Sequence, residues 1–305
     1  MIQTREDWAV VAIRSRVVYA RQTMRALPAR MVYGNDAWGS NNRGQQRTLR
    51  DLRSRQPEAV DAGAQRLADQ IDSLGYALLG TPAAPDVLAA VRAGYAEVID
   101  DPAATVDMGR RIRHVVRYVK DPLSHVPAIS GLLTPAALDV LDAFYAGSWQ
   151  IQHVRMWRIA HIPEAEQRYH HYGNQWHCDQ HPITTLKLFV QISDGVTPET
   201  GAFRFHDVPN TRRIMRTGFI DNGHAVGPAR RLMDDPSSAH YFDVPAGHSA
   251  FCNTTRCLHR AGIPPEGTTR GMVQFTFVPS TSGPRGADPF DGLPPDPNVA
   301  EGKFA

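Results

Sequence analysis

The stretch Gln175-Trp-His-Cys-Asp-Gln-His-Pro182 is the most informative part of this chain. Side chains two positions apart in an extended strand point to the same face, so His177 and Asp179 converge while Cys178 points away. An imidazole beside a carboxylate makes up two parts of the 2-His-1-carboxylate triad that holds non-haem Fe(II) and leaves other coordination positions open. Such a site requires a second histidine from a distant strand.

His259 is the candidate for that second histidine, because it follows a turn and strand pattern over residues 244–253. Arg270 comes eleven residues later and heads another strand-like run, residues 271–277. A guanidinium binds a carboxylate through two hydrogen bonds in a fixed geometry. Arg270 therefore predicts a clamp for a dicarboxylate beside the metal.

Each part of this site also has a plainer interpretation. His177 with Asp179 is equally typical of a buried hydrogen-bonded pair. His177 and His181 could form a zinc-like pair on a helix, but Pro182 and the extended context oppose helical geometry. Four side chains on one face of the following strand either line the site or meet solvent: Thr185, Lys187, Phe189 and Gln191.

Residues 150–280 have the pattern of an all-β sandwich or barrel, since short β-branched and aromatic runs alternate with turn signals. The predicted strands are 152–162, 184–192, 201–206, 239–244, 249–253 and 271–278.

Residues 56–146 are predicted to be mainly helical. Apolar residues recur at helical spacing from Val60 to Leu74, Gly75 provides a stop, and residues 76–79 form a short strand. Thr134 followed by Pro135 predicts the start of another helix.

Composition indicates an ordinary folded protein. The chain has 305 residues, 42% hydrophobic and 21% charged, which suits one large domain or two small ones. No apolar run approaches the roughly 18 residues of a membrane span, and the first one is too short for a secretory signal. Three cysteines do not make a disulfide framework. We therefore expect a cytoplasmic protein that contacts no membrane.

Charge gives little support for nucleic-acid binding, because the net charge is only +2. Residues 1–55 form a basic extension with eleven arginines and four acidic residues. One interpretation of this extension is a nucleic-acid arm, and the other is a solvated helical face or a contact in a homo-oligomer. We favour the second interpretation, since no aromatic residues are interleaved with the charges. Residues 281–305, rich in proline and glycine, predict an irregular tail.

Three features together resemble the phytanoyl-CoA dioxygenase family of Fe(II)/2-oxoglutarate-dependent oxygenases: residues 176–180, residues 193–205, and the spacing from His259 to Arg270. The resemblance covers roughly residues 60–280. It implies a mainly β fold, the double-stranded β-helix, which is a jelly roll related to the cupins and buttressed by helices.

The resemblance also implies how the domain is organised. One oxygenase domain would span residues 56–280, with a helical lead-in segment over 56–146 and a jelly-roll core over 150–280. One departure concerns residues 207–212, where the family commonly carries Pro-Gly-Ser-His, so substrate contacts cannot be transferred to this segment.

The resemblance assigns roles to five residues. Fe(II) would be bound by His177, Asp179 and His259, and the C5 carboxylate of 2-oxoglutarate by Arg270. Gln175, two residues before the first histidine, would lie near this cosubstrate. O2 would be the other reactant, and 2-oxoglutarate would leave as succinate and CO2.

The implied reaction is hydroxylation of a small molecule, such as a natural product, an amino acid or an acyl compound. Related halogenases lack the carboxylate ligand, so Asp179 favours hydroxylation over halogenation. Desaturation, epoxidation, cyclisation and epimerisation use the same ligands and stay open. Two alternatives of other classes are a 2-oxoglutarate-independent metal enzyme of the cupin type and a non-catalytic binding protein.

Overall fold

A seven-stranded antiparallel sheet is the largest element of the protein, whose structure is a computed structural model. The structure describes residues 42–54, 60–108, 112–179, 181–221, 224–225, 228–281 and 288–300. In spatial order the strands of this major sheet are β1 (Tyr76–Leu79), β10 (Ser249–Cys252), β5 (Leu186–Gln191), β12 (Thr269–Pro279), β4 (Trp149–Ala160), β3 (Val116–Val119) and β2 (Thr105–Asp107).

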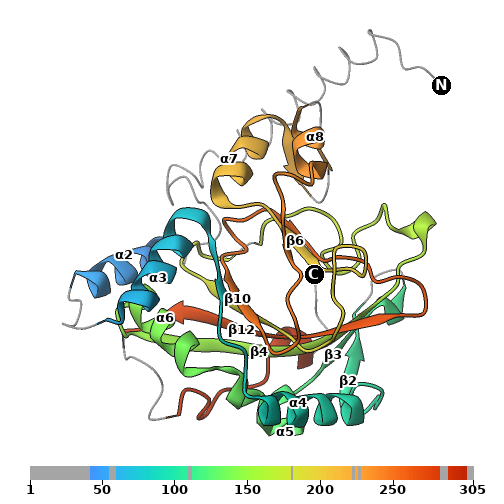
Figure 1. The fold of residues 1–305 in the computed structure, drawn as a ribbon, viewed down its shortest axis with the longest axis horizontal. Helices are drawn as coiled ribbons and strands as arrows, with labels where there is room; N and C mark the ends of the chain where they lie inside the picture. Colours follow the sequence, from blue (N-terminus) through green and yellow to red (C-terminus); the bar gives the residue numbers. More distant parts are fainter. Residues whose placement is uncertain are drawn as a thin grey trace.

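A three-stranded minor sheet faces the major sheet (Figure 1). Its strands are β11 (His259–Arg260), β6 (Phe203–Phe205) and β9 (His240–Phe242). Phe189 of β5 stacks on Phe203 of β6 with ring centroids 5.0 Å apart, so the two sheets meet through aromatic side chains. A separate hairpin joins β7 (Phe219–Asp221) to β8 (His224–Ala225).

The alternation of side chains along β12 separates a structural face from a functional one. Phe275 and Phe277 are fully buried in the core between the major sheet and the helices. Arg270, Met272 and Gln274 point to the opposite face and line a cavity between the sheets. The apolar face thus holds the strand in place and fixes the direction of the polar side chains.

Helices cover the outer face of the major sheet and one end of the minor sheet (Figure 1). The helix α3 is capped by Asp61, whose side chain accepts from the backbone N–H of Ala64 at 2.8 Å, and it ends at Gly75. Gly75 has φ +86°, and a Cβ there would lie 2.3 Å from the sulfur of Cys257, so only glycine suits this stop. The α-helices of the described residues are α2 (Asn42–Arg53), α3 (Ala62–Leu74), α4 (Pro85–Val98), α5 (Pro122–His125), α6 (Pro135–Tyr145), α7 (Val208–Arg216), α8 (Pro228–Asp234) and α9 (Pro297–Ala300).

Most of the predicted elements are present. Each of the six predicted strand segments contains a strand, and Thr134 caps α6 by accepting from the N–H of Ala137. Sequence patterns missed β2 and β3, which extend the major sheet from within the segment predicted to be helical. No helix among the described residues is both long and apolar enough to cross a membrane.

The basic extension lies largely outside the described residues, but its end does not. Helix α2 packs on the core through Leu49, which is buried. Arg53 donates to the carbonyl of Phe144 at 2.8 Å and pairs with Asp72 at 2.6 Å. Residues 42–54 are therefore part of the folded unit.

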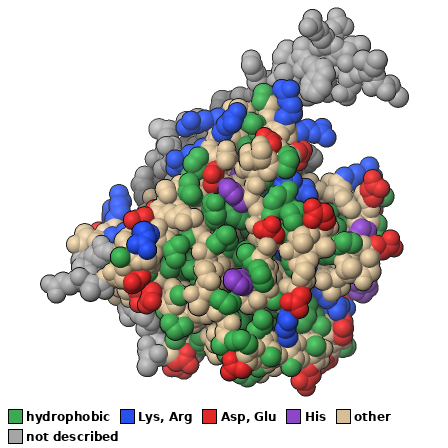
Figure 2. All heavy atoms as spheres, viewed as in Figure 1, with side chains coloured by type: hydrophobic (Ala, Val, Ile, Leu, Met, Phe, Trp, Pro, Cys, Tyr) green, Lys and Arg blue, Asp and Glu red, His purple; other side chains and the backbone are tan. Residues whose placement is uncertain are grey.

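Basic side chains also gather on the two helices outside the minor sheet. Figure 2 shows Lys and Arg side chains over α7 and α8. The exposed arginines of these helices are Arg212, Arg213, Arg216, Arg230 and Arg231.

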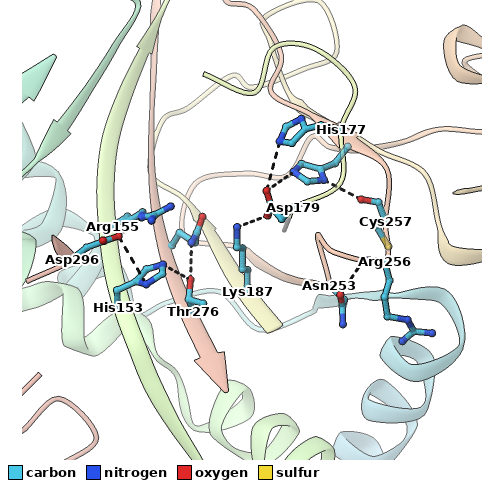
Figure 3. Close-up of polar contacts among 12 residues, drawn as sticks. His153, Arg155, His177, Asp179, Lys187, Asn253, Arg256, Cys257, Thr276 and Asp296 are labelled. Carbon is cyan, nitrogen blue, oxygen red and sulfur yellow. Dashed lines mark hydrogen bonds and ion pairs between the residues drawn. The ribbon is translucent and has the colours of Figure 1, made fainter. Parts of the chain in front are cut away.

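The C-terminal tail is anchored to the major sheet by one buried carboxylate. The side chain of Asp296 is 1% exposed and accepts from Nε of Arg155 on β4 at 2.6 Å (Figure 3). His153 lies beside it and contacts the hydroxyl of Thr276 at 2.9 Å through Nε2. The sequence predicted only an irregular tail, yet this segment holds a buried ion pair.

We expect Asp296→Ala to lower the free energy of unfolding by about 3 kcal/mol, because it removes one member of a buried ion pair. Urea unfolding followed by circular dichroism measures this change. Asp291→Ala is the matched control, since Asp291 is exposed on the same segment. Equal losses in the two variants would contradict the anchoring role of Asp296.

Candidate metal centre

The backbone of two segments brings His177 and His259 together. The two residues form an antiparallel bridge, in which each N–H donates to the carbonyl of the other at 2.9 Å. Asp179 follows, and its N–H donates to the carbonyl of Thr254 at 3.0 Å. The predicted convergence of His177 and Asp179 is present, although only a single bridge, not a full strand, holds this segment.

The three side chains form one cluster with the composition of a metal site. Nε2 of His177 lies 3.7 Å from Oδ1 of Asp179, and Nε2 of His259 lies 3.8 Å from the same oxygen (Figure 3). One ligand atom from each residue lies within 4.8 Å of the others. Among the described residues no other group of three such side chains is close enough to hold a metal ion.

Hydrogen bonds orient both imidazoles for metal binding. Nδ1 of His177 lies 2.8 Å from the carbonyl of Gln175, and Nδ1 of His259 lies 3.0 Å from the carbonyl of Cys257. A carbonyl oxygen only accepts, so in the neutral rings the proton sits on Nδ1 and Nε2 carries the lone pair. Bonds of this kind fix the orientation of metal-ligating histidines.

Lys187 on β5 holds the other carboxylate oxygen. Its Nζ lies 2.5 Å from Oδ2 of Asp179, and only 7% of its side chain is exposed. Burial acts to raise the pKa of Asp179, but Lys187 and the two histidines outweigh it and bring the pKa well below its ordinary value. The carboxylate is thus ionised, with Oδ1 directed at the two histidines.

A cavity of about 290 Å³ adjoins the three ligands. Apolar and aromatic side chains form much of its wall, and this composition is typical of a small-molecule site. Among these side chains are Met108, Tyr118, Trp157, Phe189, Phe203 and Met272.

Among the described residues, Arg270 is the one charged residue of the cavity wall that forms no ion pair. Its side chain is buried, and neither Nε nor Nη1 has a hydrogen-bond partner within the described part of the chain. Burial lowers the pKa of Arg270 to about 10. A buried guanidinium without an acceptor is costly, and a carboxylate is the ligand group that pairs best with it.

Gln175 behaves differently from the sequence expectation, whereas His181 behaves as Pro182 and its extended context predicted. The side-chain amide of Gln175 donates to the carbonyl of Gln167, and Gln175 does not line the cavity. Gln175 acts on the centre through its own carbonyl, which orients His177. His181 is not in the cluster, so the zinc-like pairing is not formed.

Sequence reasoning left some cavity residues unassigned. Lys187 and Phe189 share a strand face that we predicted to be either lining or solvated, and the structure places both in the cavity wall. His170 and His171 also line the cavity, although adjacent residues in a loop gave no signal for this. Arg155, held by Asp296, lines it too.

Comparison with known proteins supports the fold. No protein-family model matches the chain, and no curated protein matches its sequence. The structure is similar to that of EctD from S. alaskensis, solved with 2-oxoglutarate and 5-hydroxyectoine, with TM-score 0.56 and 15% identity over 80% of this chain and 86% of EctD. It is also similar to SnoN, a non-heme alpha ketoglutarate dependent epimerase from nogalamycin biosynthesis, with TM-score 0.51 and 17% identity over 77% of this chain and 90% of SnoN.

The fold is therefore the predicted one. Two facing antiparallel sheets with helices outside them form the double-stranded β-helix, or jelly roll, and the cluster of His177, Asp179 and His259 lies between the sheets. These likenesses establish the architecture, and the chemistry has to be argued from the side chains.

Buried histidines predict acid sensitivity of the metal-free protein. Burial lowers the pKa of His259 to about 3 and that of His181 to about 4, and it also lowers the pKa of His153. The unfolded chain takes up these protons near pH 6.5, whereas the folded chain does not, so stability falls as the pH drops below about 7. Each such histidine contributes about 1.4 kcal/mol per pH unit.

Urea unfolding of chelator-treated protein at several pH values between 7 and 4 measures this slope. His153→Gln should reduce the slope by about one proton. His125→Gln, which changes an exposed histidine, should leave it unchanged. A slope that is the same in the His153→Gln variant as in the wild type would contradict the explanation.

Proposed function

We propose that this protein is an Fe(II)/2-oxoglutarate-dependent oxygenase that hydroxylates a small molecule. The observation that carries the proposal is the presence of two complementary features in one cavity. A cluster of His177, Asp179 and His259 offers the donor set preferred by non-haem Fe(II). Arg270 offers a buried cation whose Nε and Nη1 atoms have no acceptor among the described residues.

Each residue has a defined part in this proposal. His177, Asp179 and His259 would hold the iron, and Arg270 would hold the distal carboxylate of 2-oxoglutarate. When bound, the metal and the keto acid supply the oxidising power drawn from O2, with succinate and CO2 as coproducts. Lys187 fixes the carboxylate of Asp179 by its 2.5 Å contact, and the aromatic wall orients substrate and excludes water.

The proposed cosubstrate has support from proteins of the same fold. EctD was solved with 2-oxoglutarate, and SnoN is described as alpha ketoglutarate dependent. At a finer level we propose that this chain is similar to the phytanoyl-CoA dioxygenase family, because of the sequence from Trp176 to Gln180 and the spacing of His259 and Arg270. We further propose that it acts in the cytoplasm, in line with its three free cysteines.

The test begins without substrate. Anaerobic addition of Fe(II) and 2-oxoglutarate to the metal-free protein should give a visible charge-transfer band. A screen of natural products, amino acids and acyl compounds for succinate release would then identify the substrate. Hydroxylation adds one oxygen atom to the product, whereas epimerisation leaves its mass unchanged, so mass spectrometry separates these outcomes.

The main competing interpretation is a cupin-type metal enzyme that does not use 2-oxoglutarate. It predicts iron binding without the charge-transfer band, and turnover that is indifferent to Arg270. A non-catalytic binding protein predicts neither band nor turnover. The unpartnered guanidinium of Arg270 favours the 2-oxoglutarate proposal over both.

A further inference from the structure

The outer face of the minor sheet carries two arginines in direct opposition. Arg260 on β11 pairs with Arg204 on β6, which in turn pairs with Tyr241 on β9. The bridge between the two histidine ligands places Trp176 opposite Arg260. Four side chains therefore form one row across the sheet, two cations between two aromatic rings, on the face turned away from the metal centre.

Like charges directly opposite one another destabilise a sheet, so this pair needs compensation. Aromatic rings supply part of it, since the guanidinium carbon of Arg204 lies 5.2 Å from the ring centroids of Trp176 and Tyr241, and that of Arg260 lies 5.6 Å from Trp176. Burial lowers the pKa of Arg260, and the charge of Arg204 lowers it further.

Hydrogen bonding does not complete the compensation. The Nε atoms of Arg204 and Arg260 are both buried without a partner in the part of the chain that the structure describes. Arg204 donates through Nη2 to the backbone carbonyl of Asp234 at 3.3 Å. Neither arginine forms an ion pair with a described carboxylate, and the charge of Asp234 only partly offsets the lowering of the pKa of Arg260. The nearby Glu199 is exposed and takes its hydrogen bond from the hydroxyl of Thr197 at 2.8 Å.

A second cavity, of about 440 Å³, opens beside this pair and shares no lining residue with the metal centre. Both arginines line it, and its remaining wall is partly apolar. The apolar and aromatic members of that wall are Pro198, Ala202, Tyr241, Ile263, Pro264 and Pro265, and Glu199 and His161 are its other titratable members.

We propose that this cavity is a second binding site, which takes the phosphate or carboxylate group of a small organic anion between Arg204 and Arg260. Guanidinium groups bind such oxyanions through paired hydrogen bonds, so one anion held between the two side chains offsets their repulsion. The apolar wall accommodates the body of the ligand. This site does not depend on the function proposed for the metal centre.

Isothermal titration of the full-length metal-free protein tests the site with two probes that share a ring, phenyl phosphate and benzoate. We expect binding of at least one probe, and the tighter one identifies the preferred head group. Arg204→Gln and Arg260→Gln should each weaken binding by about tenfold or more, as expected for loss of a charged hydrogen bond, and the double variant should lose the binding that Arg270→Gln retains.

Two further variants locate the binding. Arg212→Gln, an exposed arginine on α7, should bind as the wild type does. Arg270→Gln should also keep binding, because Arg270 lies in the other cavity. The proposal is overturned if neither probe binds with a dissociation constant below about 10 mM, since weaker binding is negligible. Unchanged binding in the double variant, or loss of binding in Arg270→Gln, would overturn it equally.

The arginines also contact Trp176, so folding of the variants must be checked by circular dichroism. If the double variant does not fold, thermal melting of the wild type decides. Phenyl phosphate should raise its melting temperature more than chloride at equal ionic strength, and it should do so in Arg270→Gln as well. No such shift would reject the site.

Discussion

His259→Ala should weaken Fe(II) binding by more than about 100-fold. Loss of a residue that only hydrogen-bonds to a metal ligand already lowers metal affinity by about 10–100-fold, and loss of a ligand should lower it further. Turnover with O2 and 2-oxoglutarate should fall below detection. His177→Ala should behave in the same way, since its Nε2 is directed at the same oxygen of Asp179. Equilibrium dialysis against Fe(II), followed by metal analysis, measures the loss.

A matched control separates ligand loss from unfolding. His125→Ala removes an exposed histidine and should bind iron as the wild type does. The His259→Ala variant should keep its far-UV circular dichroism, because the antiparallel bridge to His177 uses backbone atoms only. Full iron content in folded His259→Ala protein would refute the ligand assignment.

The sheet core was predictable because its pattern is local. Alternating apolar residues on β4, β5 and β12 identify these strands, and the N-cap at Thr134 identifies α6. Strands β2 and β3 are three and four residues long, respectively. Segments this short carry too little alternation to distinguish strand from loop, and β3 is defined by its pairing with β4 and β2.

The part of the candidate site that could be predicted consists of residues whose type limits the ligands they can bind, such as histidine and aspartate for a metal ion and arginine for a carboxylate. His177, Asp179, His259 and Arg270 are all brought to one cavity, as their spacing suggested. Gln175 was expected at the cavity by resemblance, but its backbone carbonyl is what contacts the centre.

Long-range contacts without a motif escaped the sequence. The pairing of Lys187 with Asp179 depends on how β5 packs against a non-strand segment, which alternation does not reveal. Asp296 lies 141 positions beyond Arg155 and carries no neighbouring pattern that marks it as buried. Such pairs are set by tertiary packing and can be found only once the fold is known.

Arg270→Met should weaken the binding of 2-oxoglutarate and at the same time stabilise the ligand-free protein. Removal of the guanidinium takes away two charge-assisted hydrogen bonds to the cosubstrate, so the dissociation constant for 2-oxoglutarate should rise by about 100-fold or more. The ligand-free protein should become more stable by about 1–4 kcal/mol, because a well-packed apolar side chain replaces a buried charge. Titration of 2-oxoglutarate and urea unfolding measure the two effects.

The gain in stability is the more discriminating half of this prediction. The lowered pKa of Arg270 means that its charged form is disfavoured by folding at every pH below about 10. Arg158→Met is the control, because Arg158 on β4 pairs with the exposed Asp100 at 2.8 Å. This substitution should neither stabilise the protein nor change the dissociation constant for 2-oxoglutarate. If the Arg270→Met variant were less stable than the wild type, the guanidinium would stabilise the fold through a partner within the protein. Binding of a ligand carboxylate would then no longer explain why Arg270 is buried.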